Sequence, residues 1–405
     1  MSAAPKYLTR VNGANLREIL DAHARYRARR PGGQRAPLAY ADLSNCALDG
    51  VDLADAELTG ACLRGALLRN ANLAGAVMFG VDLRDADLRE AVLSRADLRG
   101  ACLRGANLAG ADLTDCDLRE GALAFQNAKI GFHVLNYDRR PEDLDRVVIG
   151  GADLSGARFS TQSMVAADLR DADLTGAMMA GARLCRADLD GANLSNAELY
   201  DADLSDASLR RTIVCGANLE GATLRGADTS QVLRAPPRSV YIDGLPLDDV
   251  IKAHEVWCET DGREGAAAVL PDTDLRTLRS LAGRRLTAIR ASRAILFGMN
   301  LKGANLAGCD LSGADLRKAD LRMADLRGAK LIDAQLTRAD LRGAKLGPLD
   351  IGDGRMLRSN FTRASLRYAD LGYADLRRAR LLDADLTGAR MNDALLDAAE
   401  FDPAA

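Results

Sequence analysis

Residues 41–65 read ADLSN-CALDG-VDLAD-AELTG-ACLRG, and this five-residue pattern decides the fold. Leucine recurs at every fifth position from Leu38 to Leu123, with Met78 as the one substitution, which gives 18 units in one phase. Two residues before each leucine stands Ala or another small or apolar residue. Each unit therefore carries one large and one small apolar side chain.

The period of five excludes the two regular secondary structures. In an α-helix, five residues turn the chain by about 500°, so successive leucines would spread around the helix. In a flat strand, an odd period would send successive leucines to opposite faces. The pattern instead predicts a chain that turns a corner once per unit, with the Leu–Ala pair inward and the other residues outward. Because one turn cannot bury its own apolar pair, the turns must stack as coils of a solenoid.

The A-[DN]-L-x-x motif resembles the pentapeptide-repeat family, and it covers most of the chain. The resemblance implies an all-β solenoid in the form of a right-handed quadrilateral β-helix, with four units per coil and a core of stacked leucines. The period alone does not show four sides.

Breaks in the pattern predict six segments. They are a turn-helix cap module at 1–35, a first array at 36–125, an inserted loop at 126–151, a second array at 152–230, a linker with a second turn-helix module at 231–265, and a third array at 266–405. Counted by period, the arrays hold 18, 15 and 22 units. An irregular patch at 347–355, GPLDIGDGR, keeps the count but lacks the motif, so we expect a protruding or distorted corner there.

The two modules share one plan. A shift of 231 residues aligns His23 with His254 and Tyr26 with Trp257. Asn15 and the glutamate three residues later predict a capping box for the first helix. We expect each module to cover the amino-terminal end of its array. Each histidine is then either a recognition or pH-sensing element, or a residue packed on the first coil with a hydrogen bond to the backbone.

The sequence offers little chemistry. It has 3 histidines and contains no phosphate loop, nucleophile elbow, H-E-x-x-H motif or paired metal-ligand spacing. Its 8 cysteines form no C-x-x-C pair, and Cys46, Cys116 and Cys309 stand at the small inward position. We therefore expect no enzyme activity, no catalytic residue, no cofactor and no metal site.

Membrane and export signals are not evident in the sequence. No run of 18 apolar residues occurs, and the first ten residues contain no apolar stretch of the kind found in secretory signals. We expect no membrane span and a cytoplasmic location.

Charge gives the main indication about partners. The net charge is −6 over 36–125, −5 over 152–228 and +1 over 296–402. If four units make a coil, residues 20 apart stack, which places cations in two columns: Arg64, Arg84 and Arg104, and Lys302, Arg322 and Arg342. Such columns beside rows of Asp are either solvated, mutually neutralised faces or a linear site for an anionic partner.

These observations predict a scaffold that binds other proteins through its outer faces, without direct binding of nucleic acid. The alternative comes from the resemblance, because certain pentapeptide-repeat proteins bind type II topoisomerases by imitating duplex DNA. That would imply a gyrase-protecting, quinolone-resistance-like role. The net charge of −3 and the repeated D-L-R triplets speak against mimicry. Because no helix is expected to cover the last coil, we also expect a homodimer through the C-terminal coil.

Overall fold

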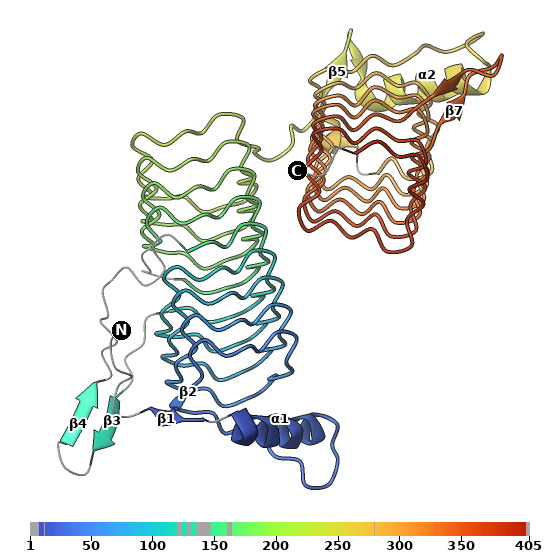
Figure 1. Cartoon of the computed structure of the whole chain (residues 1–405). Coiled ribbons are helices and arrows are strands. Elements are labelled where there is room, and N and C mark those ends of the chain that lie inside the picture. Colours follow the sequence, from blue (N-terminus) through green and yellow to red (C-terminus); the bar gives the residue numbers. More distant parts are fainter. Residues whose placement is uncertain are drawn as a thin grey trace. The chain divides into compact units, whose positions relative to one another are not determined.

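The computed structural model describes residues 8–11, 13–119, 124–127, 131–134, 147–159, 164–278 and 280–401. The chain divides into two compact units, Met1–Ala235 and Pro236–Ala405. Each unit is a stack of coils that begins with a short helix (Figure 1). Among the described residues, no helix combines the length and the apolar character needed to cross a membrane.

Successive coils are joined by parallel bridges between residues 20 apart. Asp42 pairs with Cys62, Cys62 with Asp82, and Asp82 with Cys102. The backbone N–H of Leu43 donates to the carbonyl of Cys62 at 2.8 Å, and the N–H of Cys62 donates to the carbonyl of Ala41 at 2.9 Å. Each regular coil therefore contains four units, and the stack is a β-helix solenoid. Because each unit pairs through a single residue before the chain turns, extended strands are few.

The regular corners of the coil are tight turns with a left-handed residue. Asn45 has φ 57° and Gly50 has φ 66°, and both are the last residue of their unit. The N–H of Cys46 donates to the carbonyl of Leu43 at 3.1 Å and closes the turn. A turn with positive φ at its third position favours Gly and Asn there. This requirement explains why so many units end in glycine.

The core is the ladder that the sequence predicts. Leu53 and Leu58 are fully buried, and so are the small residues Ala56 and Ala61. In contrast, Leu67 occupies the position between the inward pair, points outward and is 39% exposed. Each buried leucine contributes roughly 1.5–3 kcal/mol, so stability grows with the number of coils.

The first and second arrays form one continuous stack across the insertion. Asn107 pairs with Val148, Asp112 with Asp153, and Asp117 with Arg158, so the chain returns to the edge that it left. The insertion contains an antiparallel hairpin of β3 (Ala124–Asn127) and β4 (Gly131–Val134).

Two predicted boundaries around this insertion are wrong. The first array does not extend to 125, because Ala124 and Phe125 belong to β3. The second array begins before 152, because Val147 is already a buried residue of the stack. A periodic sequence shows where leucines recur, but it does not show which unit pairs with which neighbour. Leu123, the last of the 18 predicted units, lies outside the described residues.

The irregular patch of the second unit is a hairpin that leaves the coil. The bridge spacing is 20 between Asp325 and Lys345 but 30 between Lys345 and Asp375. The additional residues between Lys345 and Asp375 contain β7 (Leu349–Asp350) and β8 (Met356–Leu357), which pair antiparallel. The predicted irregular patch at 347–355 lies in this hairpin, which extends to Leu357. The count of 22 units is wrong, because Ile351 and Met356 are 48% and 44% exposed and form no core rung.

A helix covers the first coil of each unit. In the first unit, β1 (Thr9–Arg10) pairs in parallel with β2 (Ala41–Asp42), and α1 (Gly13–Arg27) packs apolar side chains on the core. The predicted capping box is wrong, because α1 begins at Gly13 and Asn15 lies inside it. Contacts of its apolar side chains with the core, and not a capping side chain, hold this helix on the first coil.

The second unit repeats this arrangement, but a different segment precedes its helix. A hairpin of β5 (Tyr241–Ile242) and β6 (Leu245–Pro246) precedes α2 (Leu247–Glu259), whose inner face belongs to the buried core. A single 3-10 turn, η1 (Leu275–Thr277), follows in the first coil.

The carboxyl ends of both stacks lack a covering element among the described residues. Leu204 is fully buried, whereas Leu224, one coil later, is 39% exposed. In the second unit Leu381 is 1% exposed, whereas Phe401, one coil later, is 37% exposed. Within the described residues, the last coil of each unit therefore presents apolar side chains and has no following coil of its own unit to pair with.

Two adjacent leucines test the inward and outward assignment. Replacement Leu68→Ala removes a fully buried rung, so the free energy of unfolding should fall by about 2–5 kcal/mol. Replacement Leu67→Ala removes an outward leucine and should change it by less than about 1 kcal/mol. Denaturant unfolding followed by circular dichroism measures both. Equal losses from the two variants would contradict the ladder.

Candidate interaction site

The buried side chain of His23 connects α1 to the first coil through a hydrogen bond. Its side chain is 0% exposed, and the backbone N–H of Ala36 donates to its Nδ1 at 3.0 Å. Because Nδ1 accepts this bond, it carries no proton, and the neutral imidazole holds its proton on Nε2. The ring of Tyr26 stacks on it with 5.7 Å between centroids.

His254 of α2 makes the same contacts in the second unit. Its Nδ1 accepts from the N–H of Ala268 at 3.1 Å, its exposure is 0%, and the ring of Trp257 stacks on it at 5.6 Å. The Sγ of Cys258 lies 3.6 Å from its Nε2. The structure thus places both predicted histidines in the packed, backbone-bonded arrangement.

In each module, a glycine lies close to the helix backbone near the aromatic residue. A Cβ on Gly33 would lie 2.4 Å from the backbone nitrogen of Tyr26, and one on Gly265 would lie 2.2 Å from the carbonyl oxygen of Ala253. No side chain fits at such distances. The two modules therefore share a return path of the chain over the helix as well as a histidine.

Burial keeps both histidines neutral. The pKa of His23 is lowered, chiefly because burial disfavours the imidazolium, and Arg27 adds to the shift. The backbone of Ala54 and the carboxylates of Asp52 and Asp55 oppose it. The pKa of His254 is lowered by burial against the opposing backbone of Leu286 and Thr287 and the charge of Glu255.

The outer faces are built from pairs of aspartate and arginine within one unit. Two residues apart on a strand point to the same side, so the Asp and Arg of a D-L-R triplet meet. The Nε and Nη2 of Arg89 donate to the two carboxylate oxygens of Asp87 at 2.8 and 2.6 Å. The same ion pair recurs in ten further units: 82 with 84, 97 with 99, 117 with 119, 168 with 170, 274 with 276, 315 with 317, 320 with 322, 325 with 327, 340 with 342, and 375 with 377.

These pairs neutralise the faces on which they lie. The Arg89 guanidinium holds the pKa of the Asp87 carboxyl below its ordinary value, and Arg322 does the same for Asp320. Bidentate Arg–carboxylate pairs are stronger than single hydrogen bonds and fix the geometry of both side chains. The repeated triplet is therefore a structural unit that leaves little net charge for a partner.

Three of the six cations in the two predicted columns belong to these pairs: Arg84, Arg322 and Arg342. Arg322 bonds Asp320 at 2.7 Å and approaches Asp340 of the next coil at 3.5 Å. Arg342 likewise bonds Asp340 at 2.6 Å and approaches Asp370 at 3.8 Å. In this column, positive and negative groups alternate from coil to coil.

The first column is less regular. Arg84 bonds Asp82, and Arg64 approaches Asp85 at 3.6 Å. Among the described residues, Arg104 and Lys302 have no carboxylate within ion-pair distance. A partner-binding role for the six cations, and for the four aromatic and histidine side chains of the modules, stays a prediction.

The cations beside the β7–β8 hairpin are not evident from the sequence. Lys345 and Arg378 lie next to a recess where the chain leaves the coil. The loss of motif at 347–355 indicates the place, but the sequence does not show the spacing of 30 residues across the hairpin, which decides which side chains line the recess.

The described part of the chain shows no cluster of metal-ligating side chains and no disulfide. No three His, Cys, Asp or Glu side chains in it are grouped so that they could hold a metal ion. All eight cysteines are free, and burial raises the pKa of the Cys116 and Cys309 thiols. These thiols are protonated and serve as small core residues.

Comparison with known proteins places the repeat in a family. The model of pentapeptide repeats matches in 8 copies, at residues 34–70, 63–95, 91–123, 167–206, 202–231, 294–331, 309–347 and 359–397, which is more than half of the chain. No curated protein matches the sequence.

Solved structures give distant likenesses. HetL, a pentapeptide repeat protein of the cyanobacterium Nostoc involved in heterocyst differentiation regulation, is 21% identical with a TM-score of 0.19, and the match covers 96% of each chain. Rfr23 of the cyanobacterium Cyanothece is 29% identical over 31% of this chain and 91% of its own, with a TM-score of 0.23. QnrB1, a plasmid-mediated fluoroquinolone resistance protein, is 19% identical over 46% of this chain and 80% of its own, with a TM-score of 0.20. TM-scores of this size carry no conclusion about function.

Acidification tests the neutral histidines. The folded-state pKa of His23 and His254 lies below the ordinary value of 6.5, so the unfolded chain takes up more protons as pH falls below that value. Stability should therefore drop between pH 7.5 and 5.5, a range in which carboxylates with ordinary or lowered pKa values scarcely titrate. Thermal unfolding at the two pH values measures the drop.

The matched control replaces both histidines by asparagine. An Asn side-chain oxygen can accept the backbone N–H but does not titrate in this range. The double variant should melt lower at pH 7.5, because packing is lost, but its melting temperature should change less between the two pH values. An undiminished pH dependence would contradict the assignment.

Proposed function

The chain belongs to the pentapeptide-repeat family, and on that premise we propose that it is a non-enzymatic scaffold that binds other proteins through the outer faces of a rigid β-helix. The observation that carries this proposal is that each unit uses some residues for the core and others for the outer surface. The small residue and the leucine fill the core, so only the remaining three residues of each unit face outward. Such a surface suits recognition more than chemistry.

We further propose that the solenoid is right-handed and quadrilateral. Four units per coil, each closed by its own turn, support a four-sided cross-section. A cytoplasmic location is part of the same proposal. It is supported by eight free cysteines, which suit a reducing compartment.

The alternative is a modulator of a type II topoisomerase that imitates DNA. Mimicry of duplex DNA needs a long row of unpaired negative charges, because DNA presents one charge per about 1.7 Å of helix axis. Here many outward carboxylates are held by arginines of their own unit, as in the pair of Asp320 with Arg322. The charge arrangement therefore favours the scaffold.

A capture experiment separates the two functions. The tagged full-length chain should retain a stable partner from lysate of its source cells, and the purified partner should rebind with a defined stoichiometry in calorimetry. The same chain added to a type II topoisomerase supercoiling assay should leave the reaction unchanged. Recovery of topoisomerase subunits, together with a dose-dependent effect on supercoiling, would replace the scaffold by the mimic.

We propose that two copies of the chain associate through the C-terminal coil. Leu396 and Phe401 occupy inward positions of that coil, yet each is 37% exposed. A second copy would cover this apolar face and pair its free backbone edge.

Sedimentation velocity tests the homodimer. The chain should sediment as a dimer at micromolar concentration, and Leu396→Glu should shift it to a monomer because a charge would enter the interface. The control Met323→Glu alters a residue that is 61% exposed on the side of the stack, so this variant should stay dimeric. A monomeric wild-type chain would refute the interface.

A further inference from the structure

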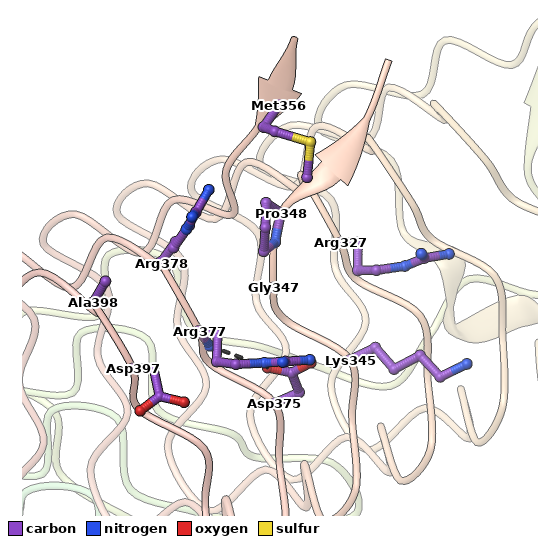
Figure 2. Close-up of a pocket in the computed structure, with 10 residues that line it drawn as sticks. All are labelled: Arg327, Lys345, Gly347, Pro348, Met356, Asp375, Arg377, Arg378, Asp397 and Ala398. Carbon is purple, nitrogen blue, oxygen red and sulfur yellow. Dashed lines mark hydrogen bonds and ion pairs between the residues drawn. The ribbon is translucent and has the colours of Figure 1, made fainter. Parts of the chain in front are cut away.

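The β7–β8 hairpin creates a recess on the side of the second unit. The chain leaves the coil at Gly347 and Pro348, and the space between the hairpin and the following coils has a volume of about 890 Å³. Figure 2 shows Pro348 and Met356 on the hairpin side, and Arg378, Ala398 and the ion pair of Arg377 with Asp375 on the coils. The hairpin that interrupts the repeat forms one wall of this recess.

The hairpin is seated on the stack through two glycines at one corner. A Cβ on Gly328 would lie 2.9 Å from the Cβ of Leu349 and 3.1 Å from the side chain of Leu357. A Cβ on Gly308, one coil earlier, would lie 3.6 Å from Leu349. The absence of side chains at this corner lets β7 and β8 pack closely on the coils. The wall of the recess is therefore held in place by packing.

The recess has more cations than its own carboxylates can neutralise. Arg327 is paired with Asp325, and Arg377 is paired with Asp375. Lys345 and Arg378 also line the recess, and among the described residues neither forms an ion pair. Asp397 is the one further carboxylate that lines it. This contrasts with the D-L-R units, in which each arginine has its own partner.

The two cations come from adjacent coils, and apolar groups stand beside them. Lys345 pairs through its backbone with Asp375, and Arg378 is the corner residue three positions later. Pro348, Met356 and Ala398 provide apolar lining, and Met356 is 44% exposed. Methionine adapts its shape to an entering side chain, which suits it to the wall of a binding site.

We propose that this recess binds an acidic peptide segment of a partner protein, with its carboxylates at Lys345 and Arg378 and an aliphatic side chain against Pro348 and Met356. Figure 2 shows the Lys345 and Arg378 side chains extending in different directions from their coils, so an extended peptide would lie across the recess with one carboxylate near each cation. The apolar wall distinguishes this ligand from a nucleic acid backbone, which would use the cations alone. The inference names a partner surface for the scaffold proposed above and rests on that function.

Fluorescence anisotropy of a labelled peptide tests the recess on the full-length chain. The probe is fluorescein-labelled Gly-Asp-Glu-Leu-Asp-Glu-Gly, and the control probe carries Asn and Gln in place of Asp and Glu. The acidic probe should bind, with an affinity that falls as salt rises, and the neutral probe should bind at least about tenfold more weakly. An unlabelled oligothymidine should not displace the acidic probe.

A pair of double variants assigns the binding to the recess. Lys345→Gln with Arg378→Asn removes both unpaired cations, and Asn suits Arg378 because this residue has φ 57°. It should lower the affinity by about tenfold or more. The matched control, Arg290→Gln with Arg186→Asn, removes one cation at a bridging position and one at a left-handed corner elsewhere, and should leave the affinity within about twofold. Unchanged thermal unfolding of both variants confirms their folds.

Four results would overturn the proposal: no binding of the acidic probe to the wild-type chain, equal binding of the neutral probe, equal losses in both double variants, or displacement by the oligonucleotide. The experiments distinguish failure of the recess proposal from failure of the scaffold proposal. If the probe does not bind while the captured partner rebinds the chain, the recess is wrong and the scaffold stands. If the probe binds as expected but no protein partner is found, the scaffold fails and the recess remains an acidic-peptide site.

Discussion

The structure depends on one constraint, which is that the chain must turn a corner every five residues and still return to the same register 20 residues later. The corner requires a residue with positive φ, as at Asn45 and Gly50, and the return places each leucine over another leucine. The hydrogen bonds between coils satisfy the backbone only in this register. Turn geometry, apolar packing and backbone pairing therefore support the same arrangement, which is typical of sequences that specify one fold.

The same register fixes the outer surface. Because the residue before and the residue after each leucine share a face, a D-L-R triplet brings its two charges together as soon as the coil forms. The pair of Asp87 with Arg89 needs no contact from elsewhere in the chain. Repetition thus produces a surface whose charges are satisfied locally. Distinctive features arise where the repeat fails: at the two helical modules, at the insertions and at the ends of each stack.

Regular parts of this molecule could be predicted from the sequence, and interruptions could not, for a physical reason. Leu53 and Ala56 point inward because the period demands it, and the modules cover the first coils because an apolar end needs a cover. Ile351 keeps the period yet leaves the coil, since only the pairing of Lys345 with Asp375 reveals that the intervening residues are excluded. The presence of Lys345 and Arg378 at one recess is likewise a product of that pairing. The histidines allowed two interpretations until burial was known, because an apolar helix face can be covered or exposed.

Where on such a surface a partner can bind follows from what binding must disrupt. A ligand carboxylate that approaches Arg322 in the middle of a face competes with Asp320 and Asp340, so the gain of one ion pair is offset by the loss of another. At the recess, Lys345 and Arg378 form no ion pair among the described residues, so a ligand carboxylate need not displace one. The exposed side chain of Met356 also becomes buried when a ligand side chain enters. An open terminal coil offers the same advantage through apolar area. Interruptions and ends are therefore the parts of the outer surface where a partner displaces least, while on the repeated faces the paired arginines and aspartates mainly hold one another.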